Sequence, residues 1–312
     1  MLQKRQYRPD RLNMHNGGEN RHNLLKGQDA GRITCYSHTV CCQPGYYSRD
    51  LNYREIYTTR RDSVHRYAAM FYEVFPKKSE VSIPVIPDGC VDVVLAFQNG
   101  SCRGISVCGT ISTLYSMEFQ KSDYIFGIRF LPGRFSPGIM GDITSFMDEQ
   151  CDFKLNSREW KFIDAMRRST DFLQRVELAK KYIAVLCDMD EYKEKMVQHA
   201  MQMIGSSGGS VGIEMLCREL IYSPRYIERI FKEYTGFSPK KMCRLVRARG
   251  AVTMLLRDRD LTKTMVAQEC GYADLSHMNR ELKSVLGIAP DMIGNADFCL
   301  KAAGASPTVY NF

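Results

Sequence analysis

The sequence has no apolar run that approaches the length of a membrane-spanning helix, and its first residues, MLQKRQYRPD, lack the apolar segment of a signal peptide. These two absences argue against a membrane protein and a secreted protein, so we expect a cytoplasmic protein without a membrane partner. Cysteine is not scarce, with 12 residues, but disulfides are not expected in that compartment. Several cysteines stand within apolar stripes, where a reduced thiol acts as a small hydrophobe: Cys90, Cys187, Cys217, Cys243 and Cys270.

Histidine is scarce, with 6 in 312 residues, and the strand-rich region between residues 51 and 152 contains only His65. That region therefore lacks the histidine cluster of a metal enzyme, and no serine or cysteine in it stands beside a plausible base in the sequence. Cys35, His38, Cys41 and Cys42 have the chemistry to bind a metal, but structural zinc patterns have two separated ligand pairs. We therefore expect no metal, no other cofactor and no enzyme, while a metal on these four residues stays open.

The net charge of +8 is unevenly distributed along the 312 residues, which are enough for two domains. Residues 1–50 carry 8 basic and 4 acidic groups, residues 51–190 carry 18 of each, and residues 191–312 carry 17 basic and 13 acidic groups. A neutral middle and a basic C-terminal part fit a polyanion binder whose other domain has a different role. The surplus is modest, so charge alone does not decide the function.

Residues 211–239 have the pattern of a short helix, a tight turn and a second helix. Ser223 followed by Pro224 is a strong helix start, and Gly236 is a typical helix stop. The residues between them divide into an apolar stripe and a polar face, as a helix that reads a major groove requires. The stripe consists of Ile227, Ile230, Phe231 and Tyr234, and the polar face of Arg225, Glu228, Arg229 and Lys232.

The same pattern occurs a second time, 51 residues further along the chain, with Asp274 at the capping position of Ser223. Between the copies, the segment PKKMCRLVRARGAVTMLLRD reads as a basic helix with apolar positions. About 18 helical residues span about 27 Å, so two reading helices on this rod could lie about one duplex turn apart, near 34 Å. Arg229, Lys232, Gly236 and Pro239 recur as Arg280, Lys283, Gly287 and Pro290.

Residues from about 193 to 290 resemble the C-terminal DNA-binding domain of the AraC/XylS transcription regulators. The resemblance rests on SPRYIERIFKEYTGFSP, on VAQECGYADLSHMNRELKSVLGIAP and on the linking helix. It implies a regulator that binds double-stranded DNA and acts on RNA polymerase, as an activator, although the residues leave open whether transcription rises or falls. The sequence departs from the family at Cys217 and Ile221, where a small residue and a glycine are usual, and at Met278 and Leu282, where aromatics are usual.

We therefore expect an α+β protein: a β-rich N-terminal domain, then an all-α domain with two helix-turn-helix units joined by a long helix. Short strands rich in β-branched and aromatic residues are expected at 66–75, 81–87, 91–97, 105–110 and 124–130. The expected parts are a mobile arm (1–45), a sensor or dimerisation domain (46–155), a helical connector (156–190), the DNA-binding domain (191–295) and a tail (296–312). The connector would pack the sensor on the reader or on a second subunit, or be buried within one chain.

The segments IPDGCVDVVLAF and GIRFLPGRFSPGIM are similar to an uncharacterised sensor-like domain often found ahead of such DNA-binding domains. A small-molecule effector and a homodimer are therefore further possible partners. Arg129 alternates with apolar residues on an expected strand, and a buried arginine needs an anion. An internal carboxylate, such as Asp88 or Asp92, is favoured over an anionic effector, which is the functional alternative.

Carrying the family's motif onto this sequence assigns the DNA-binding residues. Arg229 suits a guanine edge, and Glu228 suits either a cytosine amine or an ion pair with Lys232. Asn279 suits adenine, and Arg280 suits guanine or phosphate. The full set is Arg225, Glu228, Arg229 and Lys232 on the first helix, and Ser276, Asn279, Arg280 and Lys283 on the second, with Lys232 and Lys283 placed for phosphates. His277 is favoured as a packing residue.

Two other functions remain alternatives to a transcriptional regulator. The first is a DNA-binding domain joined to a nucleic-acid repair or modifying enzyme, which would use a reactive cysteine. The second is a helical scaffold without DNA, in which the repeat only builds a hydrophobic bundle. The sequence gives neither the effector nor the operator nor the oligomeric state.

Overall fold

The structure is a computed structural model, and the residues it describes are 43–98, 101–120, 123–135, 143–152, 157–169, 171–186, 191–257, 260–287 and 293. The set Cys35, His38, Cys41 and Cys42, nearly all of the expected arm, and the tail lie outside these residues. Among the described helices, none is long and apolar enough to cross a membrane.

The N-terminal part is built on an antiparallel sheet of six strands in the order β1-β2-β7-β4-β5-β8. A separate antiparallel ribbon pairs β3 (Glu80–Val85) with β6 (Tyr115–Gln120). Strands β1, β6 and β8 come in addition to the five that the sequence predicts. The bounds of the sheet strands are β1 (Leu51–Tyr57), β2 (Ala68–Pro76), β4 (Val91–Gln98), β5 (Ser101–Cys108), β7 (Asp123–Phe130) and β8 (Gln150–Asp152).

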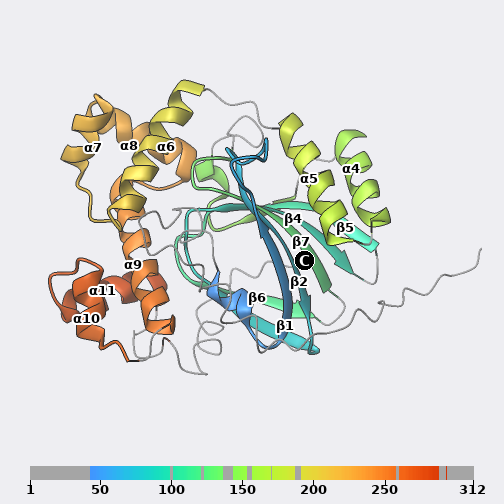
Figure 1. Cartoon of the computed structure of the whole chain (residues 1–312), viewed down its shortest axis with the longest axis horizontal. Coiled ribbons are helices and arrows are strands. Elements are labelled where there is room, and N and C mark those ends of the chain that lie inside the picture. Colours follow the sequence, from blue (N-terminus) through green and yellow to red (C-terminus); the bar gives the residue numbers. More distant parts are fainter. Residues whose placement is uncertain are drawn as a thin grey trace, which may run out of the picture. The chain divides into compact units, whose positions relative to one another are not determined.

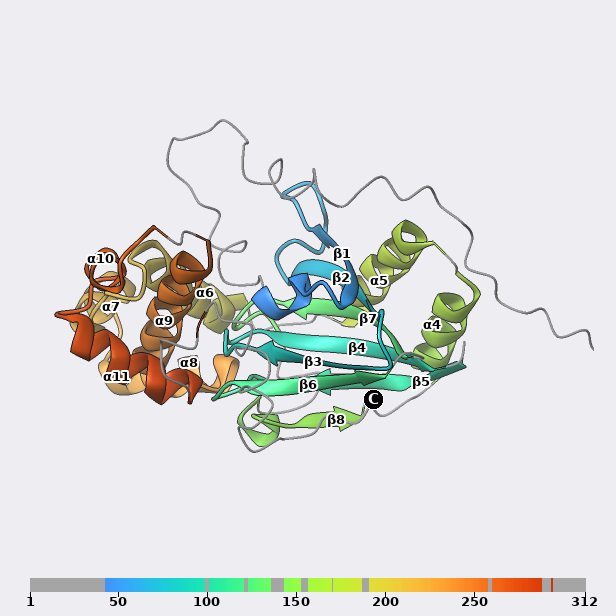
Figure 2. The ribbon, with the colours of Figure 1, turned by 90° about the horizontal axis from the view of Figure 1, so that it is seen from below.

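The sheet is buried on both faces, which explains why its strands read as almost continuous apolar runs. Val93 and Leu95 point to one face, where α4 (Ser157–Arg168) and α5 (Phe172–Leu186) cover the sheet (Figure 1). Val94 points to the other face, toward the β3–β6 ribbon and the short helix η1 (Pro44–Tyr47) (Figure 2). Helices α4 and α5 thus contribute to a hydrophobic core of the N-terminal part. A second short helix, η2 (Ile143–Phe146), precedes β8.

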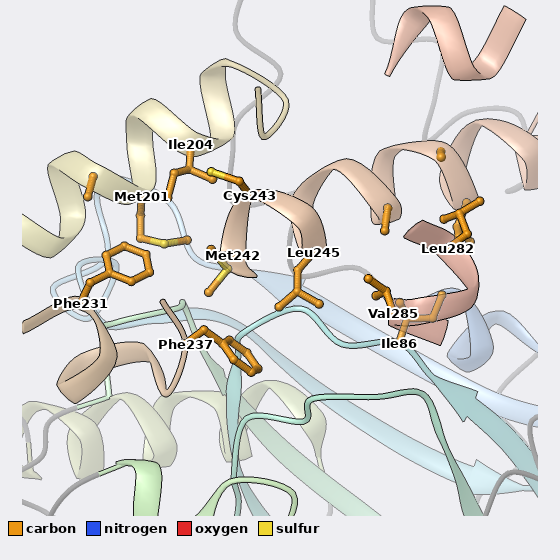
Figure 3. Packing of buried hydrophobic residues seen from close by; sticks show 14 of the residues in the cluster. Ile86, Met201, Ile204, Phe231, Phe237, Met242, Cys243, Leu245, Leu282 and Val285 are labelled. Atoms are coloured by element: carbon orange, nitrogen blue, oxygen red, sulfur yellow. The ribbon is translucent and has the colours of Figure 1, made fainter. Parts of the chain in front are cut away.

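The C-terminal part is helical, so the α+β class is confirmed. Figure 1 shows α6, α7 and α8 toward one end of α9, and α10 and α11 toward the other. Apolar side chains of α9, such as Met242 and Leu245, share one core with Phe231 of α8 and Val285 of α11 (Figure 3). The helices are α6 (Glu191–Ser206), α7 (Ile213–Leu220), α8 (Pro224–Thr235), α9 (Pro239–Arg257), α10 (Lys263–Glu269) and α11 (Leu275–Leu286).

Candidate nucleic-acid interface

Helix α8 begins and ends where the sequence predicts. The Ser223 hydroxyl accepts a hydrogen bond from the backbone N–H of Tyr226 at 3.4 Å, and Pro224 occupies the first turn. Gly236 ends the helix in the left-handed region, at φ 78°, where glycine is not strained. The apolar stripe is buried, and α7 packs against it to form the first helix-turn-helix unit: Ile227, Ile230, Phe231 and Tyr234.

The second unit, α10 and α11, repeats these local features. The Asp274 carboxylate accepts from the backbone N–H of His277 at 2.6 Å, and Gly287 ends α11 at φ 70°. Met278 and Leu282, in place of the usual aromatics, are both fully buried. The polar rows of both units therefore project from helices with equivalent caps and apolar stripes.

The outward row of the first unit is exposed along its whole length. Its four residues line one open groove of about 600 Å³, together with Ser223, Tyr226 and Ser238. The groove is lined by three cationic side chains and one carboxylate, which suits a polyanion. The four residues are Arg225, Glu228, Arg229 and Lys232.

The second outward row is less uniform. Ser276, Arg280 and Lys283 are exposed, but Asn279 is only half-exposed. The side-chain oxygen of Asn279 is buried and has no hydrogen-bond partner within the described part of the chain. His277 packs edge-to-face on the Tyr272 ring, with 5.4 Å between the ring centroids, as expected of a packing residue.

Aromatic rings support Arg229, and the sequence analysis missed them. The Arg229 guanidinium lies 5.2 Å from the ring centroid of Tyr226, and its Nη1 lies 3.9 Å from the Glu233 carboxylate. The carboxylate that pairs with Arg229 is thus Glu233, one helical turn further along α8. The Tyr226 ring stacks in turn on Tyr222, at 5.0 Å between centroids. The signal was present in the sequence, because residues three and four apart meet on a helix surface.

Glu281 is a second residue that the sequence analysis did not single out. It is buried at 6% exposure and accepts hydrogen bonds from Arg244 Nε at 3.1 Å and from Arg247 Nε at 2.9 Å. Burial alone would lower the pKa of Arg247, but its hydrogen bond with Glu281 raises it. Since both arginines are on α9, Glu281 links the second reading helix, α11, to α9 through two ion pairs.

Ile221 occupies the turn of the first unit in an unusual conformation. Its φ of 61° and ψ of 38° lie in the left-handed region, and its backbone N–H donates to Cys217 O at 3.0 Å. This conformation is strained for a β-branched residue. A position that is usually glycine in the resembled family thus holds a β-branched residue in the left-handed region.

Arg129 is 2% exposed and forms ion pairs with two carboxylates. Its Nη2 lies 2.7 Å from Asp92 Oδ2, and its Nη1 lies 3.0 Å from Asp88 Oδ2. The rings of Tyr46 and Tyr72 lie 6.0 and 5.9 Å from its guanidinium. These are the internal carboxylates that the sequence favoured, and a contact between Arg129 and an anionic effector stays a prediction.

Five thiols of the described residues are poorly suited to nucleophilic chemistry. Burial raises the pKa of the Cys243 thiol to about 11 and also raises the pKa of Cys102, Cys108, Cys151 and Cys270. A thiol with a raised pKa is largely protonated at neutral pH and reacts slowly. Within the described segments, no group of three or more metal-capable side chains comes together either.

The chain was also compared with known proteins. Residues 216–294 match a family described as a helix-turn-helix domain, and residues 62–152 match a domain of unknown function, DUF6597. The C-terminal match is of the AraC type, as the sequence analysis expected, and it covers α8 to α11 and the end of α7. No curated protein matches the chain.

Solved structures with some likeness include the C-terminal domain of AraT, a response regulator from Geobacillus stearothermophilus. It is 25% identical over 32% of this chain and 83% of that chain, with a TM-score of 0.30. ToxT from Vibrio cholerae is 12% identical over 68% of this chain and 97% of its own, with a TM-score of 0.34. The wild-type ToxT bound to an unsaturated fatty acid is also 12% identical, over 77% and 92% of the two chains, with a TM-score of 0.34.

Proposed function

We propose that this DNA-binding transcriptional regulator, with its AraC-type helix-turn-helix domain, places α8 and α11 in successive stretches of the major groove on one side of a duplex. The observation that carries the proposal is the repeat itself: two outward polar rows lie on equivalent helices, and helix α9 connects the two units. Helix α9 has 19 residues, which gives a length of about 28 Å. That length is compatible with the spacing of about 34 Å between major-groove segments one turn apart.

The first row is proposed to read bases. Arg229 suits the two acceptors of a guanine, and its support by Tyr226 and Glu233 limits the orientations of the guanidinium. Glu228 is exposed on the same outward row and suits a cytosine amine, while Arg225 and Lys232 suit neighbouring phosphates or bases.

The second row is proposed to contribute more to positioning. Arg280 and Lys283 are exposed and suit phosphates, and Ser276 suits either a phosphate or a base edge. Asn279 is proposed to read adenine, and its half-buried position means that the side chain must turn outward to do so.

The N-terminal domain is proposed to sense a small-molecule effector or to form a homodimer, and thereby to control how the reader acts on RNA polymerase. The match to a domain of unknown function leaves the effector class unassigned. We propose a non-catalytic role in the cytoplasm, because the helix-turn-helix match points to regulators and burial raises the pKa of five cysteine thiols.

The test is selection of binding sites by the full-length chain from duplexes with a random central segment. The selected duplex is then titrated between 50 and 200 mM salt. About six to ten phosphate contacts should lower the affinity about 10³–10⁵-fold over that range. A selected pool without a shared motif, together with a flat salt response, would instead indicate the helical scaffold.

A further inference from the structure

A cleft of about 710 Å³ lies between the two reading helices. Glu228 of α8 lines it on one side and Arg280 of α11 on the other, and Lys240 near the start of α9 lies between them in the sequence. Because Glu228 and Arg280 belong to the two outward rows, the cleft opens on the same side of the domain as those rows. Helix α9 therefore takes part in the surface that the reading helices present.

The cleft is positively charged. Its lining contains four cationic side chains and two carboxylates, which leaves a surplus of two positive charges. The Glu281 carboxylate is shared by Arg244 and Arg247, so it neutralises one of these two positive charges and holds both side chains in place. Lys240 and Arg280 are exposed, and neither forms an ion pair within the described residues. They are therefore available to an external anion.

Geometry identifies the anion, on the premise of the proposed function. Major-groove segments one turn apart on the same side of a duplex are separated by the minor groove and by the sugar-phosphate backbone on each side of it. A duplex that contacts both rows must pass this backbone over the space between the rows, which is the cleft. We propose that the cleft binds DNA phosphates between the two half-sites, with Lys240 as a contact from α9 and Arg280 as its neighbour. Helix α9 is then a third DNA-contacting element, in addition to connecting the two helix-turn-helix units.

The test compares the wild-type full chain with Lys240→Ala on the selected duplex and on its single-base variants, between 50 and 200 mM salt. Losing one phosphate contact should reduce the slope of log K against log salt by about 0.9, so the ratio of affinities at the two salt concentrations falls by about 3.5-fold. The affinity should fall by the same factor for every duplex variant, because a phosphate contact carries no sequence information. Lys181→Ala, an equal charge change at an exposed position of α5, should leave the slope unchanged.

The outcomes separate this inference from its premise. If the wild type binds the duplex with a steep salt response and Lys240→Ala keeps the same slope, the phosphate cleft is wrong and the proposed function stands. If Lys240→Ala changes the preference at one base pair instead, Lys240 reads a base and the inference is also wrong. If the wild type shows no salt-dependent binding to any duplex, the proposed function fails and the inference fails with it.

Discussion

Replacing Ile221 with glycine should stabilise the C-terminal domain. Ile221 has a φ of 61° and is 87% exposed, so its strained left-handed backbone is not offset by packing of its side chain. The left-handed conformation costs an L-residue about 1–2 kcal/mol, and glycine removes this cost. Glycine also has more conformational freedom in the unfolded chain, which lowers the stability of the folded state by about 0.4–1 kcal/mol and offsets part of the gain. The expected net gain in the free energy of unfolding is therefore about 1 kcal/mol.

The assay is urea unfolding of the full chain, followed by the far-UV signal of the helices. Ile221→Ala is the matched control, because alanine removes the exposed apolar side chain but keeps the Cβ that makes a positive φ unfavourable. We expect a clear gain for glycine and a much smaller one for alanine. Equal gains would mean that the exposed side chain, and not the backbone conformation, is the source. A loss of stability on Ile221→Gly would refute the strain argument altogether.

Two further substitutions test the sites within each domain. Arg129→Ala should lower the free energy of unfolding by about 3–5 kcal/mol, because it leaves Asp92 without its cation and leaves Asp88 only the longer pair with Arg249, at 3.6 Å. Urea unfolding measures this change. A stable variant that has lost only its response to an effector would make Arg129 a ligand contact. Tyr226→Leu should reduce base discrimination at the pair read by Arg229 about 2–5-fold, since an exposed cation–π contact contributes about 0.5–1 kcal/mol. Tyr226→Phe keeps the ring and should behave as the wild type in the same binding assay. If Tyr226→Phe loses as much base discrimination as Tyr226→Leu, the effect comes from the hydroxyl group and not from the ring.

Features set by neighbouring residues could be predicted from the sequence. The caps at Ser223 and Asp274 and the stop at Gly236 depend on side chains and backbone within a few residues of each other. The repeat of these signals also made the two units and their apolar stripes visible. The α+β class followed from the change from short segments rich in β-branched and aromatic residues to helical periodicity.

Features set by distant parts of the chain could not be predicted. The pairing of β2 with β7, and the packing of α4 and α5 on the sheet, join segments far apart in sequence. The role of Glu281 depends on how α11 packs against α9, since an acidic residue next to Arg280 looks like part of a solvated face. Its burial against Arg244 and Arg247 becomes visible only when both helices are in place.

The most direct test of the central claim is to measure the binding of Arg229→Ala and Arg280→Ala to the selected duplex and to every single-base variant of it. We expect Arg229→Ala to cost about 1–3 kcal/mol on the selected site and to relax the preference at one base pair. Arg280→Ala should weaken binding to all variants by a similar factor, because Arg280 lines the cleft that we propose to bind phosphates. If Arg280→Ala relaxes one position while Arg229→Ala lowers every affinity alike, the roles of the two helices are reversed. If neither substitution changes binding, the polar rows of α8 and α11 are not the DNA-reading surface.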